Sequence, residues 1–266
     1  MSLIEIIVLA IVQGMTEFLP VSSSGHLILV PAILGWEDQG LAFDVAVHVG
    51  TLLAVMLYFR AELIGMASAV LKLGRGGPEV ASDYRLAWLI VLATVPVGLV
   101  GLLARDFIEA HLRSPMVIAL TTAVFGVALW LAAKFLAGDR RVQEVRWVDA
   151  ALIGAAQALA LVPGTSRSGI TMTMGMARGL SAEASARFSF LMSIPVIVLA
   201  GGLETVKLAQ QNTPIDVTAL AVGTLVSGVF AYATIAFFLA VLKRIGMFGF
   251  MIYRLLLAVA ITALLT

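Results

Sequence analysis

Six apolar stretches of near membrane-spanning length dominate this sequence and restrict the folds that it can adopt. They cover residues 41–59, 86–104, 115–137, 184–206, 217–242 and 248–265. A helix needs about 20 predominantly apolar residues to cross the hydrocarbon core of a bilayer. Only 12% of the 266 residues are charged, whereas a soluble domain carries about 25%. The sequence therefore predicts an all-α polytopic membrane protein with six spans.

Composition excludes several other classes of function. The formal net charge is +1, which gives no electrostatic basis for binding nucleic acid. The chain has no cysteine, so disulfides, thiolate metal sites and thiol catalysis are excluded. The first basic residue is Arg60, so the N-terminal apolar segment lacks the basic region of a cleavable signal peptide. We expect that segment to stay in the fold.

Two further apolar regions are interrupted near their centres. Residues 2–34 break at Pro20, and residues 147–179 break at Pro163 and Gly164. Proline ends a helix, and the Ser, Thr and Gly residues that follow can open the next one. We therefore expect each region to form two half-helices that turn back within the membrane. Such a turn survives there only if it is buried in protein or lines a wet cavity.

The two interrupted regions match each other when one is shifted by 144 positions. The shift pairs Gln13 with Gln157, Ser22 with Ser166, Ser24 with Ser168, and Gly25 with Gly169. Each region is followed by three apolar spans, and an odd number of spans inverts the second copy relative to the first. The prediction is one membrane domain over residues 1–266. It consists of two inverted repeats, about 1–138 and about 145–266, each a re-entrant half-helix pair plus three transmembrane helices.

The distribution of basic residues predicts the orientation of this arrangement. Basic residues concentrate on the cytoplasmic side of membrane proteins. With both chain ends outside and both broken regions re-entrant, twelve of the 17 Lys and Arg residues fall on the cytoplasmic side. Three, Arg105, Arg113 and Lys207, fall on the outer side, and Arg167 and Arg254 lie within apolar segments. We therefore expect both termini on the outer side.

The first broken region carries an acid, several hydroxyls and an imidazole. Gln13 and Glu17 are four residues apart and share one helix face. A carboxylate within a membrane is a functional hypothesis by default, and the alternative is a hydrogen-bonded structural Glu. Ser23 lies three residues before His26, so a base can lie over a hydroxyl, which is the minimal activated nucleophile. The alternative is that Ser23 only caps the second half-helix.

The second broken region carries an arginine at the matching turn. Arg167 stands between Ser166 and Ser168, and its planar guanidinium suits phosphate oxygens. Two half-helix N-termini that converge would also attract an anion. The alternative is that Arg167 only pairs with Glu17. Asp44 and His48 are weaker candidates that could pack or line the site, and Arg254 is expected to pair with a buried acid or a lipid headgroup.

Two motifs identify a family that this chain resembles. QGMTEFLPVSSSGH, at residues 13–26, and PGTSRSGIT, at residues 163–171, resemble the signature motifs of the bacterial undecaprenyl-pyrophosphate phosphatase family, also called the bacitracin-resistance protein family. The similarity extends to FSFLMSIP at 188–195 and KRIGMFGFMIYR at 243–254. One departure is Gln13, where many members have Glu. The family pattern allows Gln, but the substitution removes one possible metal ligand.

The resemblance implies an integral enzyme of the bacterial inner membrane that hydrolyses undecaprenyl pyrophosphate to undecaprenyl phosphate and phosphate. It implies an active site that faces the periplasm, a prenyl pyrophosphate lipid as substrate, and a divalent cation, Mg²⁺ or Ca²⁺. Its product would supply the lipid carrier for cell-wall synthesis. The predicted catalytic residues are Glu17, Ser23, His26 and Arg167, and the predicted metal ligands are Glu17 and Gln13. The predicted substrate-binding residues are Gln13, Ser22, Ser24, Ser166, Ser168, Gly169 and Thr171.

Two alternatives stay open at this point. Ser23 attacks phosphorus with His26 as its base, or Glu17 activates a water molecule and Ser23 is only a ligand. Inverted repeats with broken helices are also a transporter architecture, so a lipid-phosphate flippase is the competing function. The sequence leaves undecided the preferred prenyl chain length, the identity of the cation and whether the protein forms a homodimer.

Overall fold

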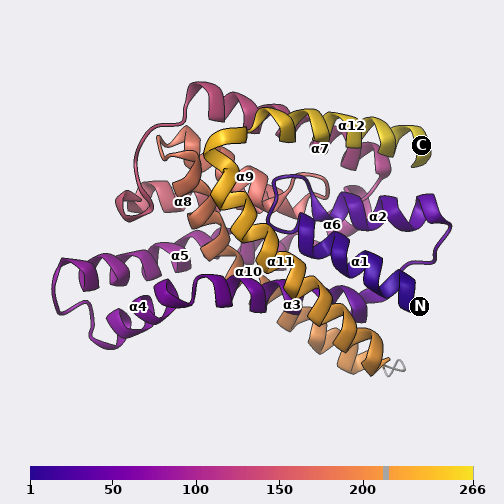
Figure 1. The fold of residues 1–266 in the computed structure, drawn as a ribbon, viewed down its shortest axis with the longest axis horizontal. Coiled ribbons are helices and arrows are strands. Elements are labelled where there is room, and N and C mark those ends of the chain that lie inside the picture. Colours follow the sequence, from indigo (N-terminus) through magenta and orange to yellow (C-terminus); the bar gives the residue numbers. More distant parts are fainter. Residues whose placement is uncertain (212–215, 266) are drawn as a thin grey trace.

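A computed structural model describes residues 1–211 and 216–265, and helices make up nearly all of the regular structure there (Figure 1). Six of the helices in these ranges are long and apolar enough to cross a membrane. They are α3 (Gly40–Tyr58), α5 (Pro78–Leu103), α7 (Pro115–Phe135), α10 (Ala182–Gln211), α11 (Val217–Ile245) and α12 (Phe248–Leu265). The prediction of an all-α polytopic membrane protein with six spans is confirmed.

The structure adds two helices that hydropathy alone did not predict. α4 (Arg60–Leu71) follows α3 directly and packs against α5, and α6 (Arg105–His111) lies between α5 and α7. A short 3-10 helix, η1 (Val142–Glu144), joins the two halves of the chain. α5 begins eight residues before the predicted span, because Pro78 supplies a favourable first helical residue.

Both interrupted regions form broken helices, as predicted. The first consists of α1 (Leu3–Thr16) and α2 (Ser23–Leu34), and the second of α8 (Trp147–Ala158), η2 (Leu159–Leu161) and α9 (Arg167–Ala177). α1 begins with a capping box, in which Ser2 Oγ accepts from the N–H of Glu5 and the Glu5 carboxylate accepts from the N–H of Ser2. α1 ends before Pro20, because proline disfavours helical backbone at the residue before it.

The two halves of the chain are interlocked. α1 and α2 pack against α11 and α12 of the second half, and α8 and α9 pack against α5 and α7 of the first. Gly14 and Gly154 allow this approach, since an added Cβ would stand 2.5 Å from the carbonyl oxygen of Ser227 and 2.4 Å from that of Ala93. Figure 1 shows both chain ends on the side of α1 and α2. The inversion of one repeat relative to the other stays a prediction.

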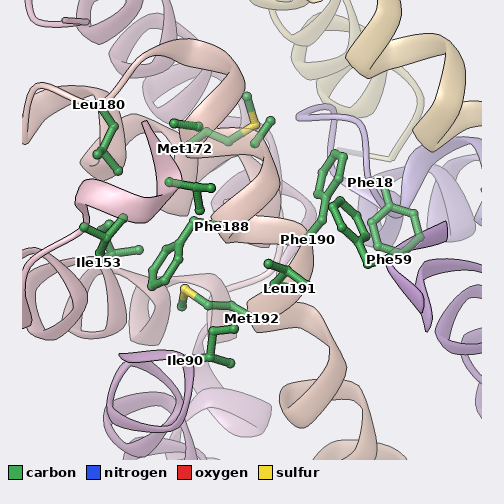
Figure 2. Close-up of a cluster of buried hydrophobic side chains, with 14 of the residues drawn as sticks. Phe18, Phe59, Ile90, Ile153, Met172, Leu180, Phe188, Phe190, Leu191 and Met192 are labelled. Carbon is green, nitrogen blue, oxygen red and sulfur yellow. The ribbon is translucent and has the colours of Figure 1, made fainter. Parts of the chain in front are cut away.

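A buried aromatic cluster fixes the position of the first turn. Phe18, the residue after Glu17, is fully buried and packs edge-to-face on Phe190 of α10, with ring centroids 5.2 Å apart. Figure 2 shows Phe18, Phe190 and Phe59 gathered together, with Phe188 and Met192 further along the same core. Because large aromatic side chains lose much contact if they move, this packing holds the Glu17 backbone in place.

Candidate active site

The turns of the two broken helices meet at one cavity of about 370 Å³, here called the central cavity. Its polar lining comes from the end of α1, the starts of α2 and α9, and the faces of α3 and α10. These lining residues include Glu17, Ser22, Ser23, Ser24, Asp44, His48, Ser166, Arg167 and Glu204. Residues that are 150 positions apart therefore contribute to one site, as the repeat in the sequence predicted.

Glu17 is the centre of the polar contacts in this cavity. Its Oε1 accepts from Arg167 Nη2 at 3.1 Å. Its Oε2 accepts from Gln13 Nε2 at 2.9 Å and from Ser23 Oγ at 3.1 Å, and His48 Nε2 lies 3.7 Å away. These donors compensate for the cost of holding a carboxylate away from bulk water. The predicted pairing of Glu17 with Gln13 and with Arg167 is present in the structure.

The two half-helices that point at the cavity begin in the same way. Ser22 and Ser166 precede α2 and α9, and their φ angles of 74° and 68° are rare for residues other than glycine. Ser22 Oγ accepts from the N–H of Gly25 at 3.4 Å, and Ser166 Oγ accepts from the N–H of Gly169 at 3.2 Å. Ser22 is therefore the cap of α2, so Ser23 is free of that role. Strained backbone of this kind is found at functional sites.

Each turn also binds the other one. Ser168 Oγ donates to the carbonyl oxygen of Leu19 at 2.9 Å, and Ser24 Oγ accepts from the N–H of Gly164 at 3.5 Å. The matched serines Ser24 and Ser168 thus each reach the turn of the opposite copy. These reciprocal contacts hold the starts of α2 and α9 together at the cavity.

His26 does not lie where the sequence interpretation placed it. Its Nδ1 donates to the carbonyl oxygen of Ser22 at 2.7 Å, and its Nε2 is 2.5 Å from the hydroxyl of Tyr253. The imidazole stacks on the Tyr253 ring with an interplanar angle of 6°. Both ring nitrogens of His26 and the hydroxyl of Ser23 thus have other partners than each other, and the catalytic role of His26 stays a prediction.

A second histidine lies at the cavity instead. His48 lines it, and His48 Nδ1 donates to the carbonyl oxygen of Asp44 at 2.7 Å, so its Nε2 faces Glu17. Asp44 also lines the cavity, and its Oδ1 accepts from Gln39 at 2.9 Å. The sequence signal for both was the four-residue spacing of two polar side chains at the start of an apolar span.

Four predicted substrate-binding residues lie behind the lining. Gln13 and Ser168 are buried, and they contact the lining residues Glu17 and Ser166, respectively. Thr171 Oγ1 donates to the carbonyl oxygen of Arg167 at 2.8 Å and is 2.7 Å from Ser189 Oγ, so it supports α9 on α10. An added Cβ at Gly169 would stand 2.9 Å from Arg254 Nη1, so this position has to be small. Ser22, Ser24 and Ser166 do line the cavity.

Arg254 binds backbone carbonyl groups rather than an acid or a headgroup. It is fully buried, and its Nη2 donates to the carbonyl oxygens of Gly164 and Thr165 at 2.9 and 3.0 Å. Its Nη1 reaches the carbonyl oxygen of Pro20 at 3.4 Å, and its Nε donates to that of Thr122 at 2.9 Å. Backbone carbonyl groups of both turns therefore take the place of the expected acid or headgroup partner. The arginine side chain is long and has several N–H donors, so it can satisfy several buried carbonyl groups at once.

The residues present suit a cation that arrives with its own oxygen ligands. Within residues 1–211 and 216–265 no group of three His, Asp or Glu side chains is arranged to hold a metal. Gln13 Oε1, beside Glu17, is buried without a hydrogen-bond partner, but so is Gln157 Oε1 in the other copy, where no carboxylate stands. Mg²⁺ is commonly held by one or two carboxylates plus substrate phosphates, and the site fits only that mode.

Fold and site together define a polytopic membrane protein with a polar cavity between the turns of two broken helices. Comparison with known sequences identifies the family of this protein. The model of the family described as bacitracin resistance protein BacA matches residues 6–260. The chain belongs to this family.

Several curated relatives match along their whole length. "Undecaprenyl-diphosphatase 2" of Stutzerimonas stutzeri is 54% identical over 268 aligned positions, which cover 99% of this chain and 98% of the relative. "Undecaprenyl-diphosphatase" of Colwellia psychrerythraea is 55% identical and covers 98% of both chains. "Undecaprenyl-diphosphatase 1" of Pseudoalteromonas translucida is 52% identical over 100% of both chains.

Proposed function

We propose that this protein is a membrane phosphatase that hydrolyses undecaprenyl pyrophosphate to undecaprenyl phosphate and inorganic phosphate. The observation that carries the proposal is the contact of Glu17 with Arg167 and Ser23 at the point where α2 and α9 begin. An acid, a hydroxyl and an arginine within one anion-attracting cavity are the parts that phosphoryl transfer requires. The names of the relatives support undecaprenyl pyrophosphate as the substrate.

The cavity binds the pyrophosphate through charge and through free backbone N–H groups. A guanidinium has five N–H donors, and two Arg167 nitrogens are engaged, with Glu17 and with the carbonyl oxygen of Ser189 at 3.1 Å. The remaining donors serve phosphate oxygens. The N-termini of α2 and α9 add the positive ends of two helix dipoles. Arg167 therefore positions the terminal phosphoryl group next to Ser23.

Ser23 is the nucleophile in the mechanism that we favour. Its Oγ is hydrogen-bonded to Glu17 Oε2, so the carboxylate accepts the proton as the oxygen attacks the terminal phosphorus. The bond from that phosphorus to the bridging oxygen breaks, and undecaprenyl phosphate leaves with its electron pair. Water then attacks the phosphoserine, which releases inorganic phosphate and restores Ser23. In the competing mechanism, Glu17 takes the proton from a water molecule that attacks directly.

Glu17 would hold a divalent cation, Mg²⁺ or Ca²⁺, that enters with the pyrophosphate, and Gln13, which donates to Glu17, would contribute through a water molecule. When bound, it neutralises charge that develops on the phosphoryl oxygens. We expect a chelator to abolish hydrolysis and either cation to restore it. We also expect no measurable binding of Mg²⁺ by isothermal titration when pyrophosphate is absent. Full activity in the presence of the chelator would contradict this role.

The site opens toward the periplasm in our proposal, with both chain ends on that side of the inner membrane. The support is the concentration of basic residues on the opposite flanks. Cysteines introduced at Arg75 and Arg141 of this cysteine-free chain should resist an impermeant thiol reagent in intact cells. Permeabilised cells, in which both should react, are the control. Rapid labelling at both positions in intact cells would reverse the orientation.

The decisive test of the function uses purified protein in detergent, where no gradient exists. Phosphate release from undecaprenyl pyrophosphate is expected in that preparation and not with Glu17→Gln, which keeps the shape of the side chain but removes the charge. A flippase would move lipid across vesicles without releasing phosphate. Absence of phosphate release by the wild-type protein, with the cation supplied, would overturn the proposal.

A further inference from the structure

A second cavity, of about 480 Å³, adjoins the central cavity and is here called the lateral groove. It lies between α5 and α10, with η2 and α6 at its ends. Of the fourteen described residues that line it, only Arg113 and Glu204 are charged. Pockets of this volume and character hold apolar ligands.

The two cavities share a wall. Val196, Ala200 and Glu204 line both of them. These residues are four apart, so they form one stripe along α10. The consecutive residues Ala160 and Leu161 of η2 line the central cavity and the lateral groove respectively. The central cavity and the lateral groove are therefore neighbours along a single face of α10.

The lateral groove also opens to the surroundings of the helices. Leu102 and Leu199, which belong to its lining, are 70% and 57% exposed on the two helices that flank it. In a membrane such positions face lipid tails. The groove thus joins the phosphate site to the hydrocarbon of the bilayer.

We infer that the lateral groove binds the first isoprene units of the prenyl chain while the pyrophosphate occupies the central cavity. This inference rests on the proposed function. The prenyl chain is attached to a phosphate in the polar cavity, so the chain has to leave that cavity. An apolar path is favoured, because each methylene group that stays in contact with water costs free energy. The shared stripe on α10 supplies that path.

Glycines keep the path open. Gly98, Gly101 and Gly202 line the groove, and glycine is unfavourable inside a helix unless space requires it. A Cβ at Gly98 or Gly202 would meet nothing within 4 Å, and at Gly101 it would meet only Leu161 methyl groups at 3.7 and 3.9 Å. None of the three has a positive φ angle, so larger residues are compatible with the backbone.

The test fills the groove from these positions. Gly101→Leu and Gly202→Leu should raise the KM for undecaprenyl pyrophosphate about tenfold, because the side chains replace the isoprene units, while kcat stays near the wild-type value. Inhibition by inorganic pyrophosphate, which has no chain, should be unchanged. The matched control is Gly249→Leu, a helical glycine with open space that lies outside the groove, and it should change neither constant.

The outcomes of this test distinguish an error in the groove assignment from an error in the proposed phosphatase function. An unchanged KM in both groove variants would overturn the assignment while leaving the phosphatase intact. A KM and a pyrophosphate inhibition constant that rise together would also overturn it, since the substitutions would then be acting on the phosphate cavity. Failure of the wild-type protein to release phosphate would instead overturn the proposed function.

Discussion

The two broken helix pairs have the same backbone design and different chemistry. Ser22 and Ser166 both have a positive φ angle, and each caps the next half-helix through the same contact. At the other matched positions the copies diverge: Glu17 corresponds to Leu161, Ser23 to Arg167, and His26 to Ile170. In the mechanism that we propose, the first copy supplies the acid and the nucleophile, and the second supplies the phosphate-binding arginine. A repeated scaffold becomes one site because each copy keeps only part of the chemistry.

The paired glutamines show how one substitution changes a neighbour's role. Gln13 and Gln157 are both fully buried. Gln13 Nε2 donates to Glu17, whereas Gln157 Nε2 reaches the carbonyl oxygen of Ala93 at 3.4 Å, because Leu161 offers no acceptor. The same side chain therefore holds the acid in one copy and only ties two helices in the other.

The matched acidic residues at the starts of the two broken helix pairs differ in burial. Glu5 begins α1 in an exposed capping box with Ser2. Asp149, its counterpart, is fully buried and binds Arg140 at 2.6 Å and Arg178 at 2.9 Å. Both acids therefore form a local cap, since Asp149 also accepts from the N–H of Arg146 at 3.0 Å, but Asp149 adds a tertiary junction.

Replacement of Ser23 should have the largest effect on activity and would sharpen the division of roles between the copies. If its hydroxyl attacks phosphorus, Ser23→Ala should lower kcat more than about a thousandfold. Stability should change little, because Ser22 caps α2. The measurement is phosphate release by the purified variant, with its melting temperature as the control. Activity within threefold of wild type would leave Glu17-activated water as the mechanism.

The second largest effect on activity is expected for Arg167→Lys. Lysine keeps the charge but has no planar fork, so it cannot bind Glu17, the Ser189 carbonyl and phosphate together. We expect kcat/KM to fall about a hundredfold, comparable to the loss of one preorganised donor. The expression level and the circular dichroism spectrum should match the wild type. Near-normal hydrolysis would show that a simple positive charge is enough in the second copy.

The matched acids give a contrast in stability. Asp149→Asn breaks two contacts of a buried carboxylate, and we expect a loss of about 2–3 kcal/mol, less than for a fully buried pair because Arg140 and Arg178 are partly exposed. Glu5→Gln should cost under about 0.5 kcal/mol, since its contacts are at the surface. Thermal unfolding in detergent measures both. Equal shifts would remove the distinction between cap and junction.

His26 and Tyr253 should behave as one unit. Their hydrogen bond and ring stacking are both lost in His26→Ala and in Tyr253→Ala, whereas Tyr253→Phe removes only the hydrogen bond. We expect a coupling free energy of about 1–2 kcal/mol in a double-mutant cycle of His26→Ala with Tyr253→Ala. Stability and kcat/KM are both measured. Strictly additive effects on both would restore an independent role for His26.

The serine caps of α2 and α9 should contribute equally to stability. Ser22→Ala and Ser166→Ala should each lower the free energy of unfolding by about 1 kcal/mol, the usual cost of losing a helix N-cap. Because the two caps have the same geometry, the two losses should be equal within error. A clearly larger loss at one turn would mean that the copies differ in scaffold as well as in chemistry.

The spans and the two breaks could be read directly from the chain. Membrane helices need long apolar runs, so residues 41–59 predict α3 closely. Pro20 and Pro163 mark the two breaks because Ser, Thr and Gly residues that can open a new helix follow them, whereas Pro31, Pro96 and Pro195 lie inside helices. The meeting of Glu17 with Arg167 was also predictable, because matching motifs at Pro20 and Pro163 placed both in equivalent turns. These features depend on local sequence or on its repetition.

The partner of each histidine was decided only by the tertiary structure. A three-residue spacing allows His26 to reach Ser23 but does not require it, and Tyr253, 227 residues away, offers a hydroxyl and a ring face instead. In the same way, α3 brings His48 to Glu17 through packing against α10 and α11. The sequence determined which polar groups had to be sheltered from lipid. Packing of distant helices determined which of them meet, since side-chain partners across a fold depend on contacts that no local pattern encodes.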